Sequence, residues 1–502
     1  MSVQLSLLEG PEAALSDATP VLVVLRPGAA ALGPRAAALD AWTGGAITRA
    51  CRSPRCKGAA GEVVDLLAPA GLAARRVVVL SLGAAAELTA QTAVLAGAAL
   101  ARHLEAEAEP EAALLFDAPE AAALPAPEIL GNLLLGLRLR HDRFEMTPRA
   151  ETLPDLALTL VADAGAADAS ALTRSAAVAE GVTLARKLVN LPASHLHPET
   201  FARHLAPLRE AGIGIEVLEP ADLERLGMRA ILAVGNGSDR KPRVIVLTHA
   251  GAPGAPLALV GKGICFDAGG LCIKTGPQMF TMKGDMGGAA AVVGTLLALA
   301  RQKAPVHVVG VLAVAENLVS GASYKPGDIV TTMSGRTVEV YDTDCEGRMV
   351  LADALHYAAT RFQPRAIVDL ATLTYSVMRG LGHVFAGLFA THDRLAEGLL
   401  AAGEATGERF WRLPLDPAYD ECLRSPVADL RQHGRDLEDG DAPVAAAFLR
   451  HFAEGRPWVH LDIAGKELID EDRPLARAGG QGFGVRLLED WITGLGPDLA
   501  RL

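Results

Sequence analysis

Two segments of the chain gather charged residues directly after apolar, strand-like runs. In residues 260–294 these are Lys262, Asp267, Lys274, Lys283 and Asp285, and in residues 340–355 they are Asp342, Asp344, Glu346 and Arg348. Ionised groups that emerge from apolar strands are costly unless they are paired or bind metal. Several carboxylates that converge without histidine suit hard or borderline divalent ions. Two such ions about 3.5–4 Å apart could hold an attacking hydroxide between them, which indicates a hydrolytic site.

The same residues have simpler interpretations when they are taken singly. Asp267 before two glycines fits a turn, Asp285 before two glycines and an Ala-rich run fits a helix N-cap, and Glu346 with Arg348 fits a surface salt bridge. Asp344, Glu346 and Arg348 are spaced at i, i+2 and i+4, so an extended backbone would point all three the same way. The metal site accounts for the whole set with fewer coincidences.

The lysines of the first segment are a second, independent indication. The chain has nine lysines against 38 arginines, yet three of the nine are Lys262, Lys274 and Lys283. A lysine beside a cation can lose its proton and bind metal through a neutral amine, whereas arginine stays charged. A compact ammonium can also stabilise a developing oxyanion. These lysines are therefore candidates for catalytic work.

Apolar runs with helical stretches between them surround both segments. The runs predicted as strands are residues 243–249, 257–266, 306–314 and 366–373. GGAAAVVGTLLALARQ and GRMVLADALHYAATRF predict helices, and a further long helix should end at Pro192. Strands that alternate with helices predict a mixed, mostly parallel sheet sandwiched by helices. In such sheets functional groups gather beyond the carboxyl ends of the strands.

The length of 502 residues favours two domains. Residues 20–26 and 76–82 read as buried strands among Ala-rich helical runs, which predicts a small N-terminal α/β domain. The polar segment LRHDRFEMTPRAETLPD resembles a linker. We therefore expect an α/β fold with an N-terminal domain over 1–150, a connecting linker and helix over 151–180, and a larger catalytic domain over 181–502.

Bulk properties weigh against several classes of protein. A net charge of −12 argues against a nucleic-acid partner, which would need a cationic face. No run reaches the roughly 18 apolar residues of a membrane span, and the N-terminus lacks the pattern of a signal peptide. Six cysteines without CxxC spacing indicate buried thiols rather than a zinc knuckle. The expected location is the cytoplasm.

Both charged segments resemble motifs of the leucyl aminopeptidase family, also called the cytosol aminopeptidase family. Its usual NTDAEGRL reads DTDCEGRM here, and its VGKGITFDSGG…K…M…DMGGAA block is similar to residues 260–290. LVNLPASHLHPETFA, GDIVTTMSGRTVEV, DLATLT and WVHLDIAG resemble other phrases of the family, so the similarity covers roughly 180–490. LLLGLRLRHDRFE resembles the end of the family's N-terminal domain.

The resemblance implies a role for each matching residue. The ligands of two divalent ions, zinc or manganese, would be Lys262, Asp267, Asp285, Asp344 and Glu346. Asp267 and Glu346 would bridge both ions, and Lys262 would bind through its neutral amine. Lys274 would polarise the scissile carbonyl and stabilise the oxyanion. Arg348 would hold a bicarbonate ion that acts as general base for a metal-bridged hydroxide.

The residues implied for the substrate pocket include two departures from the family pattern. The pocket would be formed by Met282, Thr372, Leu373, Tyr375 and Glu467. Met282 and Thr372 match the family, but Tyr375 stands where glycine is common and Glu467 where methionine is often found. The pocket should therefore be smaller or more polar than a leucine-selective one.

The function implied is a two-metal aminopeptidase that removes the N-terminal residue of short peptides. By resemblance the assembly would be a homo-hexamer, a dimer of trimers. Two alternatives stay open: an acidic scaffold or DNA-binding role, which the resemblance to the family implies because some of its bacterial members bind DNA, and a two-metal phosphoesterase, which the ligand set alone could support. His195, His197 and His460 are interpreted as structural residues.

Overall fold

The computed structural model describes residues 3–8, 19–28, 31–146, 155–163, 165–434, 440–496 and 499. The chain divides into two compact units, one of Met1–Ala179 with Asp472–Arg477 and the other of Glu180–Glu471 with Ala478–Leu502. The predicted boundary near residue 150 lies outside the described residues. The segment expected as a linker and helix contains strand β6 (Leu156–Val161), followed by helix α5 (Ala169–Asn190).

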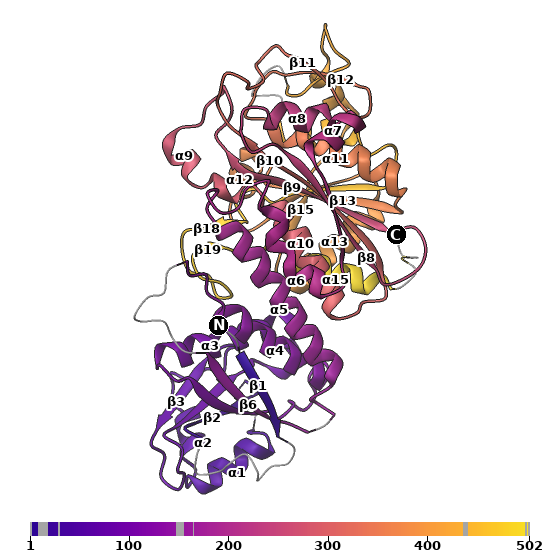
Figure 1. Ribbon diagram of the computed structural model, residues 1–502. Coiled ribbons are helices and arrows are strands. Elements are labelled where there is room, and N and C mark those ends of the chain that lie inside the picture. The colour runs from indigo at the N-terminus through magenta and orange to yellow at the C-terminus, as the bar shows by residue number, and fades with distance from the viewer. Residues whose placement is uncertain are drawn as a thin grey trace. The chain divides into compact units, whose positions relative to one another are not determined.

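The first unit is a six-stranded sheet covered on both faces (Figure 1). The strand order is β1-β6-β5-β2-β4-β3, and every pair is parallel except β3 with β4. Alternate residues of β2 pack on different helices: Val23 joins the cluster of α3 and α4, and Val24 that of α1 and α2. The bounds are β1 Val3–Leu8, β2 Val21–Arg26, β3 Val63–Leu67, β4 Arg76–Ser81, β5 Glu111–Leu115, α1 Pro34–Trp42, α2 Ala46–Cys51, η1 Ala85–Glu87, α3 Ala90–Ala106 and α4 Ala126–His141. The predicted strands 20–26 and 76–82 are confirmed as β2 and β4.

The second unit contains an eight-stranded mixed sheet in the order β15-β14-β17-β13-β9-β10-β8-β7. Its four central strands, β17, β13, β9 and β10, are parallel to one another. Strands β14, β8 and β7 join antiparallel, and β15 pairs parallel with β14. The bounds are β7 Gly214–Leu218, β8 Arg243–Ala250, β9 Leu257–Asp267, β10 His307–Asn317, β13 Ala366–Ala371, β14 Ala386–Ala390, β15 Phe410–Arg412 and β17 Trp458–Asp462. The four predicted strands and the mixed, mostly parallel sheet are confirmed.

Helices α10 (Gly287–Arg301) and α11 (Glu346–Phe362) cover opposite faces of this sheet. Val260 of β9 packs with Leu351 of α11 in one core cluster. On the other face α10 lies so close that a Cβ on Gly288 would stand 2.0 Å from the carbonyl oxygen of Leu370. The glycines that begin α10 therefore allow its first turn to contact the backbone of the sheet.

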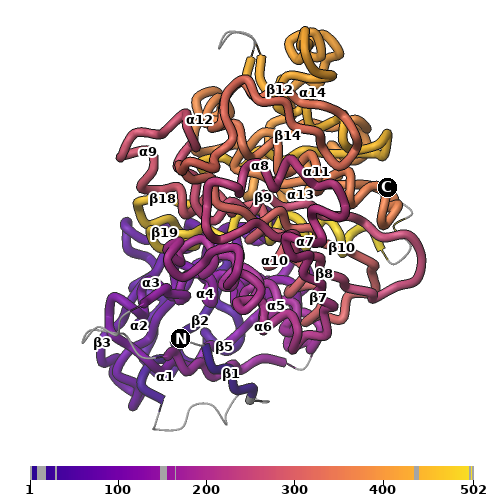
Figure 2. The backbone as a smooth tube through the Cα atoms, turned by 45° about the horizontal axis from the view of Figure 1, so that its top comes forward, coloured from indigo at the N-terminus to yellow at the C-terminus, as the bar shows by residue number. Residues whose placement is uncertain are grey.

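Shorter elements complete the second unit. Helices α6 (Ala206–Glu210), α13 (Asp393–Thr406) and α15 (Val485–Leu495) lie on the α10 side, and α8 (Arg229–Gly235) and α14 (Asp441–Arg450) contact α11. Both views show α9 at the periphery of this unit (Figures 1 and 2). The remaining bounds are η2 Phe201–Leu205, α7 Pro220–Leu226, α9 Gly276–Phe280, η3 Met282–Gly284, β11 Ile329–Thr331, β12 Thr337–Glu339, α12 Tyr375–Leu381, η4 Pro417–Leu423, β16 Leu430–Arg431, β18 Leu468–Ile469 and β19 Gly479–Gly480.

Two further predictions concern bulk properties. In the described part of the chain, no helix has both the length and the apolar character needed to traverse a bilayer. The six cysteines are free thiols, but the expectation of buried thiols holds only for Cys51 and Cys265, because the other four are partly exposed.

Candidate metal centre

Polar residues stand at the carboxyl ends of the four central parallel strands. Asp267 ends β9, Asn317 ends β10, Asp462 ends β17, and Thr372 directly follows β13. Carboxyl ends of parallel strands meet at one edge of a sheet, which is where ligands bind in α/β proteins. A cavity of ≈ 490 Å³ opens at this edge. Every predicted site residue lines it: Lys262, Asp267, Lys274, Met282, Asp285, Asp344, Glu346, Arg348, Thr372, Leu373, Tyr375 and Glu467.

Lys262 projects from β9 into a group of buried acidic side chains. Its Nζ lies 2.7 Å from Oδ1 of Asp285 and 2.8 Å from Oε1 of Glu346. It also donates to the carbonyl oxygen of Thr372 at 3.1 Å. Burial lowers the pKa of the Lys262 amine, but the attraction of these carboxylates outweighs burial, so the pKa is raised. In this arrangement Lys262 is an ammonium group.

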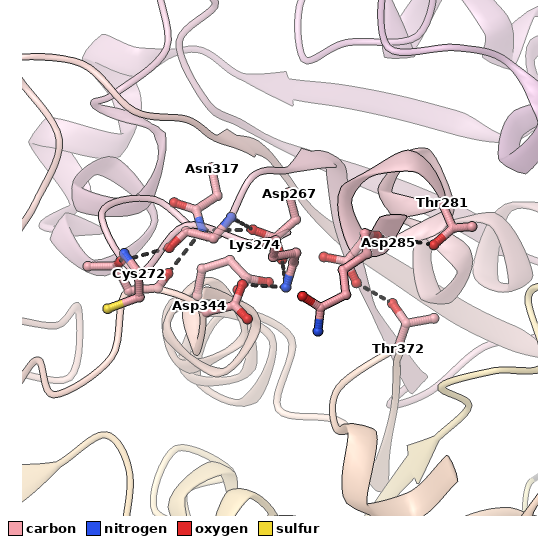
Figure 3. Close-up of polar contacts among 12 residues, drawn as sticks. Asp267, Cys272, Lys274, Thr281, Asp285, Asn317, Asp344 and Thr372 are labelled. Carbon is pink, nitrogen blue, oxygen red and sulfur yellow. Dashed lines mark hydrogen bonds and ion pairs between the residues drawn. The ribbon is translucent and has the colours of Figure 1, made fainter. Parts of the chain in front are cut away.

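Lys274 forms a second ion-pair centre in the same cavity (Figure 3). Its Nζ lies 2.8 Å from Oδ2 of Asp267 and pairs with Oδ1 of Asp344. The Nζ is also 5.6 Å from the ring centroid of Tyr375, within range of a cation–π contact. Burial opposes its charge, but the carboxylates prevail and raise the pKa of Lys274. The two lysines thus balance part of the negative charge of the cavity.

The carboxylates themselves are close enough to share a cation. Asp267, Asp344 and Glu346 each offer an oxygen, and these oxygens lie within 4.8 Å of one another. Burial and the repulsion of Asp267 and Glu346 raise the pKa of Asp344 to about 7, although Lys274 opposes this shift. Burial also raises the pKa of Asp285 well above its ordinary value. Such a cluster needs more positive charge than two lysines supply.

Two atoms of the cluster test whether divalent ions fit. Oδ2 of Asp285 is buried and has no hydrogen-bond partner among the described residues, and the buried Oε1 of Glu346 has its ion pair with Lys262. Buried polar atoms without partners are rare and are explained by a bound ion or water. Carboxylate oxygens with one amine form a donor set that suits divalent ions at hydrolytic sites. The residues therefore fit the metal ions that the resemblance implies.

The loop after β9 fixes the position of Asp267. Oδ1 of Asp267 accepts hydrogen bonds of 2.8 Å from the N–H of Gly269 and from Nδ2 of Asn317. Gly269 has φ +87°, and a Cβ there would stand 3.0 Å from Oδ1 of Asp344. Thr343 ties the two segments together, because its hydroxyl donates to the carbonyl of Gly269. The glycines therefore bring the two charged segments into contact.

Arg348 lines the same cavity as the carboxylates and is buried, with 2 % exposure. Its Nη1 donates to the carbonyl oxygen of Gln432 at 2.9 Å, and its Nη2 pairs with Oδ1 of Asp441 at 2.9 Å. Burial opposes the charge of Arg348, but its acidic surroundings raise its pKa. The side-chain carbonyl of Gln432 in turn accepts from the backbone N–H groups of Tyr341 and Asp342.

Three sequence-based interpretations need correction. Asp344, Glu346 and Arg348 do not follow an extended backbone, because α11 begins at Glu346 and a turn precedes it. Asp285 is not the N-cap of α10, whose N-cap residue is Met286. Glu346 and Arg348 are both buried, so they form no surface salt bridge. Asp267 does make the expected turn contact, in addition to its ion pair with Lys274.

The predicted pocket residues border the carboxylates in the same cavity. Met282 belongs to η3, and Tyr375 begins α12 and is 39 % exposed. Oε2 of Glu467 is buried and unpartnered among the residues that the structure describes. Burial raises the pKa of Glu467 to about 7. The pocket thus combines apolar surface with one acidic side chain.

Sequence reasoning missed several residues of this site. They are Asn317, Thr343, Ser376, Gln432 and Asp441. Asn317 could have been predicted, because it is a polar residue at the end of an apolar run, which forms a buried strand that pairs with β9. Gln432 and Asp441 could not, because they follow no motif and lie more than 80 residues after Arg348. The described residues that line the cavity do not include His195, His197 or His460. Nδ1 of His460 forms a hydrogen bond of 2.6 Å with Oδ1 of Asp369.

The fold and the site define an α/β protein with an acidic cavity at the carboxyl ends of parallel strands in a mixed sheet, and the residues of this cavity fit divalent metal ions. The catalytic domain of the cytosol aminopeptidase family matches residues 183–489, and the family's N-terminal domain matches residues 22–147. The chain belongs to the cytosol aminopeptidase family, and it is a metal-dependent aminopeptidase.

Relatives and solved structures of similar length agree with this assignment. The "Probable cytosol aminopeptidase" of Xanthobacter autotrophicus is 43% identical over 479 residues, which cover 94% of this chain and 95% of that protein. The protein of the same name from Methylorubrum extorquens is 45% identical over 451 residues, covering 88% and 89%. Bottromycin maturation enzyme BotP in complex with Mn has a TM-score of 0.82 at 37% identity, covering 95% of this chain and 100% of that one. A mutant of tomato leucine aminopeptidase has a TM-score of 0.83 at 30% identity, covering 98% and 97%.

Proposed function

We propose that this cavity hydrolyses the N-terminal peptide bond of short peptides with the help of two divalent ions. The observation that carries the proposal is the meeting of Asp267, Asp344 and Glu346 within 4.8 Å, beside two buried lysines. The ions would be held by these three carboxylates together with Asp285 and Lys262. When bound, such ions polarise a carbonyl and lower the pKa of water, which is the chemistry that peptide hydrolysis needs.

Lys274 is the residue we assign to the oxyanion. Its ammonium lies in the cavity between Asp267 and Asp344, where burial excludes competing water. A preorganised positive charge stabilises the negative oxygen of the tetrahedral intermediate more than it stabilises the neutral carbonyl. Arginine at this position would be bulkier and less able to approach one oxygen.

We propose that the group that accepts the proton of the attacking water lies next to the guanidinium of Arg348. The resemblance implies a bicarbonate ion there, held by the guanidinium. The buried positive charge of Arg348 supports an anion at this place.

The side chain of the substrate's first residue would enter the part of the cavity bordered by Met282, Tyr375 and Glu467. Oε2 of Glu467 has no hydrogen-bond partner among the described residues, so it could accept a hydrogen bond from a cationic or hydrogen-bond-donating side chain of the substrate. We infer that this enzyme favours polar or basic first residues more than a leucine-selective member of the family does.

Two proposals follow from family membership alone. A homo-hexamer, a dimer of trimers, would enclose the cavities and admit only short peptides; its mass in solution is measured by light scattering. A cytoplasmic location is supported by the name "cytosol aminopeptidase" that the relatives carry. Fractionation of cells that express the protein tests it.

The decisive experiment measures hydrolysis of aminoacyl nitroanilides by the purified protein with zinc or manganese. We expect activity that a chelator abolishes and either metal restores. Glu346→Gln and Asp267→Asn should lose bound metal and turnover together, while Asp222→Asn, on the exposed helix α7, should lose neither. Nitrophenyl phosphate serves as the comparison substrate, because its hydrolysis without any anilide hydrolysis would overturn the proposal in favour of a phosphoesterase.

A further inference from the structure

The guanidinium of Arg348 is already occupied by groups of its own chain. Nη2 pairs with Oδ1 of Asp441, and Nη1 donates to the carbonyl oxygen of Gln432, both at 2.9 Å. Nε is buried and has no partner among the residues that the structure describes. An external anion would therefore have to displace the Asp441 carboxylate before it could bind Arg348 through two parallel donors, which is the strong geometry for such ions.

The surroundings of Asp441 stabilise its negative charge and leave part of the carboxylate exposed to the cavity. It is the first residue of α14, where the helix dipole favours negative charge. Its Oδ2 accepts a hydrogen bond of 3.4 Å from the hydroxyl of Ser376, and Nε2 of His433 lies 3.8 Å from Oδ1. Its side chain is 24 % exposed and lines the same cavity as Asp344 and Glu346. Part of the carboxylate therefore faces the space where substrate would bind.

Charge balance also opposes a bicarbonate ion at this position. One guanidinium faces one carboxylate here, so a second anion beside Asp441 would meet a like charge in a partly buried site. Two like charges at contact distance in a partly buried site repel each other. The contacts of Arg348 thus do not fit the bicarbonate that the resemblance implies.

We propose that Asp441 itself is the general base of this enzyme and replaces the bicarbonate. This proposal rests on the aminopeptidase function proposed above. Asp441 accepts a proton from the attacking water as the water oxygen bonds to the scissile carbonyl carbon. It then gives the proton to the leaving nitrogen as the C–N bond breaks, so the carboxylate is regenerated and one water is consumed. Arg348 and Ser376 position the carboxylate.

The first test uses the unchanged, metal-loaded protein and needs no variant. Bicarbonate labelled with ¹³C is titrated into the protein in carbonate-free buffer, and binding is followed by NMR. We expect no saturable binding, and anilide hydrolysis that changes less than about twofold when bicarbonate is removed or restored. Saturable binding that Arg348→Ala abolishes, or a strong dependence of turnover on bicarbonate, would overturn the proposal.

The second test compares two substitutions of Asp441. Asp441→Ala frees the guanidinium and opens space, so kcat should fall about 10²-fold or more, the usual contribution of a general base, and added formate or bicarbonate should restore part of it. Asp441→Ala should also gain saturable ¹³C-bicarbonate binding. Asp441→Asn keeps the space filled, so kcat should fall equally but without rescue. A purely structural ion pair would give no anion rescue, and that result, or near-normal kcat in Asp441→Ala, would contradict the assignment.

Asp393→Asn is the matched control. Asp393 also begins a helix, α13, and also pairs with an arginine, Arg412, at 2.6 Å, but it lies outside the cavity lining. We expect this variant to keep the wild-type kcat. If neither the wild type nor the control hydrolyses any anilide, the aminopeptidase assignment fails on its own, and the ¹³C measurements still decide which anion Arg348 holds.

Discussion

The side-chain nitrogen of Lys262 lies 2.7 Å from Oδ1 of Asp285, and both side chains are buried. This pair places a positive charge where the proposed metal site would need a neutral amine. The amine is held charged because Asp285 and Glu346 outweigh the effect of burial on its pKa. A bound cation would take over that attraction and repel the ammonium proton. Proton release from Lys262 should therefore be part of metal binding.

Metal affinity is accordingly expected to rise with pH. Above pH 7.5 Asp344, whose pKa is about 7, is mostly deprotonated, whereas Lys262 still holds a proton that a metal ion must displace to bind its amine. Because metal and proton compete for the amine, higher pH favours the metal, by about tenfold per pH unit for one proton. Calorimetry in buffers of different ionisation enthalpy measures the protons released. Lys262→Met should lose the slope and Lys283→Met should keep it, whereas affinity independent of pH would show that Lys262 is not a ligand.

Lys274 is expected to act on the rate rather than on metal binding. Lys274→Ala removes the charge that would face the oxyanion but leaves the carboxylates of Asp267 and Asp344 free for the ions. We expect metal content near that of the wild type and a kcat lowered about 10²–10³-fold, the usual loss for one oxyanion donor. Metal analysis and anilide kinetics on the same preparation separate the two effects. Lys325→Ala, at an exposed turn, is the control. A near-normal kcat in Lys274→Ala would remove Lys274 from the mechanism.

The central part of the fold was predictable because its strands are buried on both faces. Residues 257–266 and 306–314 are continuous apolar runs for that reason, and they became β9 and β10. Lys262 lies in the middle of β9, whereas Asp267 and Asn317 lie at the strand ends, where the functional groups of such sheets are expected. Strand β6 was missed, because its run LALTLV is short and follows a polar, Pro-containing segment that resembles a linker.

The residues that contact the site from distant parts of the chain could not be predicted from local sequence patterns. Arg348 and Asp441 are separated by 93 residues, and nothing in either local sequence indicates that they pair. The start of α11 at Glu346 was not predicted, because the i, i+2, i+4 spacing of Asp344, Glu346 and Arg348 fits an extended chain equally well. Such contacts depend on tertiary packing, so only the folded chain reveals the competition between Asp441 and an external anion.

A stability prediction concerns Asp353, which is completely buried in α11. Its carboxylate accepts from the N–H groups of Ala230 and Ile231 at the start of α8, at 2.9 and 3.0 Å, and from that of Met333 at 2.8 Å. Asp353→Ala leaves these donors without an acceptor, which should cost about 2–5 kcal/mol. Thermal unfolding of the metal-free protein measures it, and Asp353→Asn should lie between alanine and wild type. Asp222→Ala, at an exposed capping position, should change much less.

The last prediction is a pH-dependent substrate preference set by Glu467. Because burial raises the pKa of this carboxyl to about 7, it is mostly neutral at pH 6 and mostly charged at pH 8.5. A charged carboxylate binds a lysyl or arginyl side chain more strongly than the neutral acid does, by about 1.5–3 kcal/mol. The ratio of kcat/KM for lysyl over leucyl anilide should therefore rise about 6- to 10-fold from pH 6 to pH 8.5, because about a tenth of the carboxyl groups are already charged at pH 6.

Two variants isolate the carboxyl group in this measurement. Glu467→Gln keeps the shape but cannot ionise, so its lysyl-to-leucyl ratio should stay constant across the same pH range. Glu467→Met, the residue often found in the family, should favour the leucyl substrate at every pH. Other ionisations in the cavity act on both substrates alike and cancel in the ratio. If the wild-type ratio does not change with pH, the side chain of the first residue does not reach Glu467, and the acidic pocket is not the one that selects substrate.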